Sequence, residues 1–146
     1  MSVIWFRIGA VLAGLAVVTG AFAAHGLEKP LLKQYGDATK QVMGREIPAA
    51  EKYLADFKTA AEYQMYHALA LLAIGVLGAT RPLNRSLNIA AWSFLLGILL
   101  FSGSLYLLVL TGQTKLGMIT PIGGVLFLIG WLSLAFYSTK FQTNDL

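Results

Sequence analysis

The sequence predicts an all-α membrane protein that folds as an antiparallel bundle of four transmembrane helices. Three observations support this prediction. First, 57% of the 146 residues are hydrophobic, 12% are charged and the mean hydropathy is +0.67, whereas soluble domains are about 45–50% apolar and about 25% charged. Second, four apolar segments each reach the ~20 residues that a spanning helix needs. Third, the last three segments are joined by short links, which make neighbouring helices antiparallel.

The four expected spans cover about residues 3–24, 57–79, 86–112 and 116–137. The first carries Arg7 near its start, and the second carries Lys58, Glu62 and His67, whereas the third and fourth contain no charged residue. None of them alternates polar and apolar residues as a barrel strand does, so helices are the expected spanning elements. The first segment also resembles a signal peptide, since it ends in Ala21-Phe22-Ala23, but we expect it to be a span.

The segment from about residue 28 to 56 predicts an amphipathic helix at the membrane interface, between spans one and two. Pro30 suits a first helical turn and Gly44 a helix end, and the apolar residues between them fall mainly on one face, namely Leu31, Leu32, Tyr35, Val42 and Met43. Such a helix either lies on the membrane surface or is a solvated loop helix without a partner. Pro48 predicts the start of a further helix that leads into span two.

Small residues indicate where the helices pack closely, because helix association in lipid depends on close backbone contact. The glycines expected at these contacts are Gly20, Gly97, Gly103, Gly123 and Gly124. Pro121, inside the fourth span, is expected to kink that helix, since it has no N–H to donate to Gly117. Three tryptophans lie near or within span ends and are expected to be interface anchors, namely Trp5, Trp92 and Trp131.

Ionisable residues within spans are the candidate functional residues, because they are costly in lipid. The candidate cluster comprises His25, Glu62, Tyr63, Tyr66 and His67. If the end of span one lies beside the start of span two, His25 and Glu62 share a depth and can pair. Three functions are open: haem ligation by the two histidines, metal binding with Glu62, and a proton relay or a small-ligand or lipid site. A hydrogen-bond network that joins the two spans is the interpretation we favour.

Several classes of function are disfavoured by what the sequence lacks. It has no cysteine, so disulfides and thiolate metal sites are excluded. The net charge of +4 comes from lysines and arginines scattered between apolar segments, so we expect them to contact lipid headgroups and no nucleic acid. The sequence contains neither a set of nucleophile, base and orienting residue nor a phosphate-binding glycine loop. We therefore expect no enzyme activity, no cofactor and no metal.

Four motifs resemble those of a known family. They are Gly20-Ala21-Phe22-Ala23-Ala24-His25-Gly26-Leu27, then Tyr63-Gln64-Met65-Tyr66-His67-Ala68-Leu69, then Phe101-Ser102-Gly103-Ser104-Leu105-Tyr106, and finally Thr120-Pro121-Ile122-Gly123-Gly124. The chain resembles the family called domain of unknown function 423, which includes transmembrane protein 256 and the YgdD-like small membrane proteins. The resemblance implies a four-helix protein of the bacterial inner membrane without an assigned reaction. Ala23 replaces the family's usual glycine, and residues 31–50 look like an insertion.

These observations together predict an accessory or scaffold component of a membrane assembly, with a membrane-protein partner or a second copy as its contact in the bilayer. We expect both termini on the same side of the membrane. The long loop contains six lysines and arginines, which favour that loop inside the cell. Long folded segments follow the charge rule less strictly, however. We favour cytoplasmic termini, because this orientation places the cations of the chain ends and the second link in the cytoplasm, namely Arg7, Arg81, Arg85 and Lys140.

Overall fold

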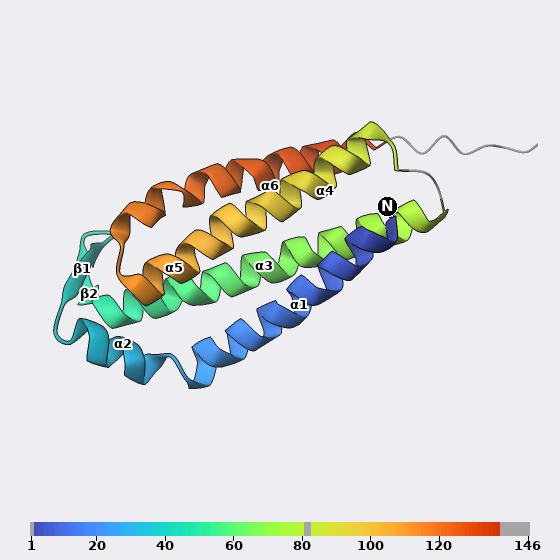
Figure 1. Ribbon diagram of the computed structural model, residues 1–146. Helices are drawn as coiled ribbons and strands as arrows, with labels where there is room; N and C mark the ends of the chain where they lie inside the picture. Colours follow the sequence, from blue (N-terminus) through green and yellow to red (C-terminus); the bar gives the residue numbers. More distant parts are fainter. Residues whose placement is uncertain (1, 81–82, 138–146) are drawn as a thin grey trace, which may run out of the picture.

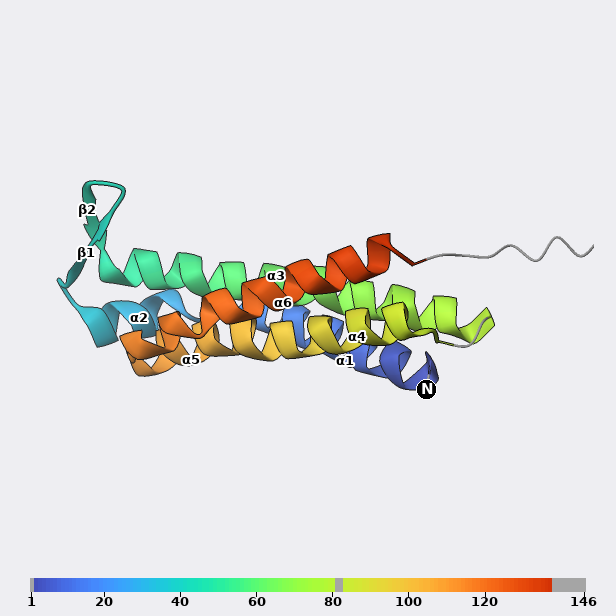
Figure 2. The same ribbon diagram turned by 90° about the horizontal axis from the view of Figure 1, so that it is seen from above.

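The computed structural model describes residues 2–80 and 83–137 and confirms the four-helix bundle. The spans are α1 (Ser2–His25), α3 (Ala49–Thr80), a third span built from α4 (Arg85–Gly97), η1 (Ile98–Ser102) and α5 (Gly103–Thr111), and α6 (Thr120–Ala135). They run up and down beside one another (Figures 1 and 2). Four helical segments are long and apolar enough to cross a membrane. Arg81, Pro82 and Lys140, which entered the orientation argument, lie outside the described residues.

The bundle is organised around α3 and the third span. α1 packs along α3, α6 packs along α4 and η1, and α3 contacts α4, η1 and α5 between them. Figure 1 shows the consequence: α1 and α6 lie on opposite sides of this central pair, and the N-terminal end of α1 and the C-terminal end of α6 are at the same end of the bundle. α1 and α6 therefore present most of their side chains to the surroundings, which suits helices that face lipid.

Glycines allow α1 and α3 to approach each other. A Cβ added at Gly75 of α3 would lie 2.6 Å from the backbone nitrogen of Phe6, and one added at Gly9 of α1 would lie 2.8 Å from the carbonyl oxygen of Ala68. Such distances leave no room for a side chain. The two helices are thus held at backbone contact, as small-residue packing in lipid requires.

The segment between α1 and α3 differs from the prediction. A helix is present, but α2 covers only Glu28–Tyr35 and ends at Gly36, which has φ +53°. A β-hairpin follows, in which β1 (Thr39–Val42) pairs antiparallel with β2 (Arg45–Pro48). Val42 and Met43 are therefore not on the amphipathic helix, and Gly44 is a turn residue. Figure 2 shows the hairpin projecting sideways from the end of the bundle that carries α2.

Two local features explain why this segment forms a hairpin. Met43 and Gly44 have φ values of +51° and +77°, and two consecutive residues with positive φ are typical of the two-residue turn that joins twisted strands. α3 then begins at Ala49, directly after Pro48. This agrees with the expectation that a helix starts at Pro48. The further helix expected there and span two are consequently one helix of 32 residues.

The third span is interrupted by η1, a π-helical turn over Ile98–Ser102. Such turns are rare and often occur at functional sites. The hydroxyl of Ser102 is fully buried and has no hydrogen-bond partner among the described residues. Ser104, on the next turn, does find partners: its hydroxyl donates to the carbonyl oxygen of Phe101 at 3.0 Å and lies 2.8 Å from the hydroxyl of Thr120 on α6.

Pro121 does not lie inside a continuous helix of the fourth span, where it was expected to cause a kink. A 3₁₀ turn, η2 (Thr114–Met118), comes first, and α6 starts at Thr120, so that Pro121 occupies the first turn of the α-helix. A proline is tolerated there, because the first N–H groups of a helix have no partner inside it. Pro121 thus marks the start of α6, and the chain changes helix type before it.

Candidate functional site

The structure separates the ionisable residues that were expected to cluster. The end of α1 lies beside the first turns of α3, where the rings of Phe22 and Phe57 are 6.1 Å apart. His25 and Glu62 are therefore not at the same depth, and both are exposed. The expectation was wrong because α3 begins at Ala49, about two turns earlier than predicted. His67 is buried and lies ten residues, about 15 Å, beyond Phe57.

His67 instead joins α3 to α6. The indole N–H of Trp131 donates to Nε2 of His67, with 3.2 Å between the nitrogens. Because an indole can only donate, Nε2 is the acceptor and Nδ1 carries the imidazole hydrogen. Nδ1 then donates to the carbonyl oxygen of Tyr63 at 2.7 Å. The ring also stacks on Phe127, with ring centroids 3.4 Å apart and planes 5° apart.

This geometry bears directly on haem and metal ligation. The hydrogen on Nδ1 of His67 and the lone pair on Nε2 are both used in bonds to protein groups, so the imidazole has no free lone pair for a ligand bond. His25 lies at the far end of α1, and among the described residues no three His, Cys, Asp or Glu side chains group as metal ligands. As placed among the described residues, His25 and His67 do not fit a site for haem or a metal ion. Trp131 was expected to be an interface anchor, but its N–H is bonded to His67.

A second polar network joins α3 to α1 and α5. The side chain of Gln64 donates to the carbonyl oxygen of Leu12 on α1 at 2.8 Å and accepts from the hydroxyl of Tyr106 on α5 at 3.0 Å. The hydroxyl of Thr19 on α1 lies 3.0 Å from the hydroxyl of Tyr106. A hydrogen-bond network between spans one and two is therefore present, and Gln64 forms it through its bond to Leu12. Sequence reasoning did not identify Thr19 or Tyr106 as members.

Beside His67 lies an open groove between α3 and α6, with a volume of about 650 Å³. Six rings form most of its walls, namely Tyr63, Tyr66, His67, Phe101, Phe127 and Trp131. Tyr63 stacks on Phe101, with centroids 4.7 Å apart, so η1 also contributes to the wall. Of the predicted cluster, Tyr63, Tyr66 and His67 thus come together, while His25 and Glu62 do not line the groove.

The predicted packing glycines fall into two groups. An added Cβ would lie 2.5 Å from Phe127 at Gly97 and 2.4 Å from the backbone nitrogen of Phe101 at Gly123, so these two glycines sit in helix contacts. Gly20 has no neighbour within 4 Å, and the nearest atoms at Gly103 and Gly124 are 4.0 Å away. Those three glycines do not mediate close contacts. Gly124 instead leaves space in the wall of the groove.

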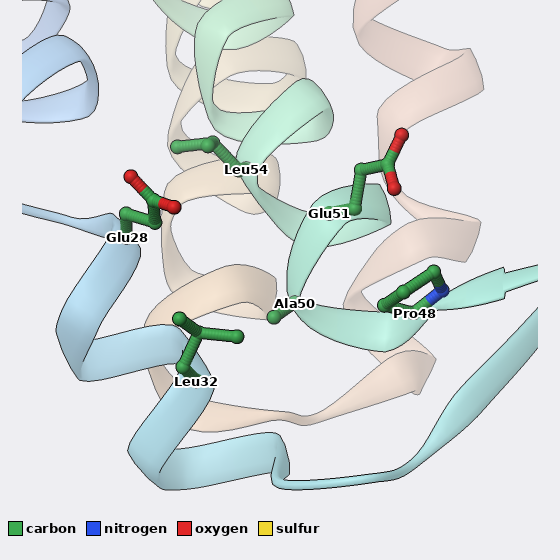
Figure 3. Close-up of a pocket in the computed structure, with 6 residues that line it drawn as sticks. All are labelled: Glu28, Leu32, Pro48, Ala50, Glu51 and Leu54. Atoms are coloured by element: carbon green, nitrogen blue, oxygen red, sulfur yellow. The ribbon is translucent and has the colours of Figure 1, made fainter.

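A smaller pocket of about 260 Å³ lies between α2 and the start of α3 (Figure 3). Its walls include the carboxylates of Glu28 and Glu51, which stand on different sides of the apolar residues Leu32, Ala50 and Leu54. Because the two carboxylates do not converge, the pocket does not form an acidic binding site. The groove beside His67 is the stronger candidate.

Comparisons with known proteins identify the family. The family model described as "Protein of unknown function (DUF423)" matches residues 19–124. A UPF0382 membrane protein of Staphylococcus epidermidis is 45% identical over 138 residues, which cover 94% of this chain and 97% of the relative. Another from Staphylococcus aureus is 46% identical over 134 residues, 92% and 93% of the two chains. The chain belongs to the DUF423 family. No solved structure matches it.

The DUF423 family is described as being of unknown function, and its staphylococcal relatives are named as membrane proteins. The four apolar helices of this chain agree with that description. The staphylococcal relatives align with nearly the whole length of both chains. The insertion expected over residues 31–50 stays a prediction.

Proposed function

We propose that this DUF423 protein is a non-enzymatic component of a membrane assembly and that its partner packs on the outer face of α3. This face consists of exposed residues at helical spacing between α1 and the groove, namely Lys58, Glu62, Leu69, Ala73 and Val76. We place the assembly in the bacterial inner membrane, with both termini in the cytoplasm. The cations of the chain ends and of the second link support that orientation.

A single observation supports this proposal: Glu62 is exposed on a spanning helix, one turn beyond Lys58. The candidate span covers Ala49–Ala79, and Glu62 is its charged residue that lies farthest from the start, followed by an uncharged run to Ala79. The ion pair found among the described residues joins Lys52 and Asp56. No described cation lies within ion-pair distance of the Glu62 carboxylate. An isolated carboxylate in hydrocarbon is costly.

A partner helix resolves this cost if it brings a cation or a hydrogen-bond donor to Glu62. Lys58, one turn away, also faces outward, so a second copy of the chain has both signs of charge to offer. A different membrane protein with a donor at this depth fits equally. The surface around Glu62 is apolar, with Leu69 and Val76 half exposed, as expected for a helix face that is covered in the assembly.

The non-enzymatic part of the proposal rests on the chemistry of the buried polar groups. His67 and Gln64 are both used in bonds that connect helices. Among the described residues no nucleophile bonds to His67, whose ring nitrogens bond to the carbonyl oxygen of Tyr63 and the indole of Trp131. Ser102 is isolated, with no partner for its hydroxyl among the described residues.

Photo-crosslinking in native membranes tests the proposal. A photoreactive phenylalanine analogue at Leu69 is expected to give a discrete protein adduct, whereas the same group at Val18, an exposed residue of α1, gives lipid adducts. Glu62→Ala should remove the Leu69 adduct and the larger species on blue-native gels. Because Glu62 makes no described internal contact, the thermal stability of the purified chain should not change. A single small species and lipid adducts at both positions would refute the proposal.

A further inference from the structure

We infer that the groove between α3 and α6 binds a lipid-soluble, flat ring that carries carbonyl oxygens, the chemistry of an isoprenoid quinone. This inference goes beyond the proposed function and uses different residues. It rests on the depth of the groove, on the polar groups that face it and on the shape of its walls.

The depth of the groove determines how a ligand reaches it. His67 lies near the middle of the span that contains α3, about 27 Å from its first residue and about 18 Å from its last. The groove is open at its side, and three of its residues are half exposed there, namely Tyr66, Val125 and Leu128. A ligand therefore enters from the hydrocarbon of the bilayer. Water-soluble ions and metabolites do not partition to this depth.

The polar groups of the groove select for an acceptor. His67 and the indole N–H of Trp131 satisfy each other, so they offer nothing to a ligand. Tyr63 and Tyr66 also line this region, and neither hydroxyl has a hydrogen-bond partner among the described residues. A hydroxyl in hydrocarbon without a partner costs free energy. A ligand carbonyl oxygen can accept from these phenols, whereas a plain acyl chain cannot.

The walls suit a flat ring. Aromatic groups favour offset stacking or edge contacts with other rings, and the groove offers faces or edges from both α3 and α6. Phe101 belongs to the π-helical turn η1 and stacks on Tyr63, so the irregular turn supplies part of this wall. The volume of about 650 Å³ falls within the roughly 300–1,000 Å³ of small-molecule sites. It accommodates a substituted ring and the first units of an apolar tail.

Gly124 provides the decisive variant. A Cβ added there meets only a Phe101 ring atom at 4.0 Å, so a larger side chain fills the groove without a backbone clash. Gly124→Leu should therefore block the site in a folded protein. Gly14→Leu is the matched control, because Gly14 is exposed on α1 and has no neighbour within 4 Å.

The test uses the purified full chain in nanodiscs with a 1,4-naphthoquinone that carries two isoprene units. Trp5→Phe and Trp92→Phe leave Trp131 as the tryptophan that reports binding by fluorescence quenching. We expect saturable quenching that Gly124→Leu abolishes and Gly14→Leu preserves. Tyr63→Phe and Tyr66→Phe should each weaken binding about three- to tenfold, the effect of one hydrogen bond. A naphthalene with the same tail but no carbonyl should bind weakly.

Two results would overturn the inference. Quenching that rises linearly with quinone and is the same in Gly124→Leu and Gly14→Leu means partitioning into lipid and no site. If Gly124→Leu abolishes binding but the carbonyl-free naphthalene and the phenylalanine variants bind as tightly, the groove takes an apolar chain and the acceptor ring is wrong. Neither result depends on Glu62, so the proposed assembly is tested separately.

Discussion

Trp131 of α6 donates its indole N–H to Nε2 of His67 on α3, across 3.2 Å. Since α6 packs mainly on α4 and η1, this bond and the stacking of His67 on Phe127 connect α6 to the α1–α3 pair. In lipid, a polar bond of this kind joins elements whose apolar surfaces gain little from association. His67 thus has a structural role that does not require any ligand.

The first prediction concerns this bond. Trp131→Phe leaves Nε2 of His67 without a donor in an apolar site, and His67→Phe removes the acceptor. Each single change should lower the free energy of unfolding by about 1 kcal/mol. Because replacing both partners removes the unpaired group, the double variant should be more stable than the sum of the two losses predicts. Unfolding in mixed detergent measures all four proteins, and strict additivity would contradict a coupled pair.

The second prediction concerns the contact of α1 with α3. Gly75→Ala places a Cβ where the backbone nitrogen of Phe6 is 2.6 Å away, so the helices must separate. We expect a loss of about 1–3 kcal/mol, the usual cost of overpacking. Gly14→Ala, on the open side of α1, should be neutral or stabilising, since alanine favours helix over glycine. Thermal unfolding in detergent compares the two, and equal midpoints would argue against backbone contact at Gly75.

Composition was sufficient to predict the four spans, because the bilayer imposes a length and a polarity that the sequence displays directly. The position of the polar residues was harder to predict. The first two turns of α3 contain charges, so hydropathy placed the start of span two at residue 57, and this error shifted Glu62 to the depth of His25. Glycine spacing had a similar limit. Gly123 and Gly124 are adjacent in sequence, yet their directions around α6 put one against Phe101 and the other in the groove.

The hairpin was missed for another reason. The segment Thr39–Pro48 is short, and Val42 and Met43 fit a helix face as well as a strand. Gly44 fits a helix end, because it lacks a side chain. The same property allows it to follow Met43 with a second positive φ and close a two-residue turn. Only the pairing partner on β2 distinguishes the two interpretations.

The third prediction concerns pH. The hydroxyl of Tyr35 on α2 donates to the carbonyl oxygen of Val109 at 2.9 Å. Burial, and secondarily the nearby Tyr53, raise the pKa of Tyr35 above its usual 10.0. A raised pKa means that folding favours the neutral phenol. This contribution to stability is present in full below pH 10 and is lost as the pH rises through the pKa of the folded protein.

Ultraviolet titration of tyrosinate checks this prediction. The difference between the wild-type chain and Tyr35→Phe reports the phenol of Tyr35, and its midpoint should exceed 10. The midpoint should fall to the ordinary value when the protein is unfolded. Tyr35→Phe should also reduce the loss of stability above pH 10. A difference midpoint at or below 10 in the folded protein would contradict this partly buried hydrogen bond.

The last prediction concerns the turn of the hairpin. Met43 has φ +51° and is 98% exposed, so its side chain contributes little packing while its backbone adopts a conformation that L-residues rarely tolerate. Asparagine favours the first position of such turns. Met43→Asn should therefore stabilise the hairpin by about 0.5–1 kcal/mol, and Gly44→Ala should destabilise it by about 1 kcal/mol. Hydrogen exchange of the peptides that cover Thr39–Pro48 measures both, with slower exchange in the first variant and faster exchange in the second.

Met118→Asn, which changes an exposed methionine outside the hairpin, controls for the loss of a surface methionine. If it slows exchange in Thr39–Pro48 as much as Met43→Asn does, the stabilisation does not come from the turn.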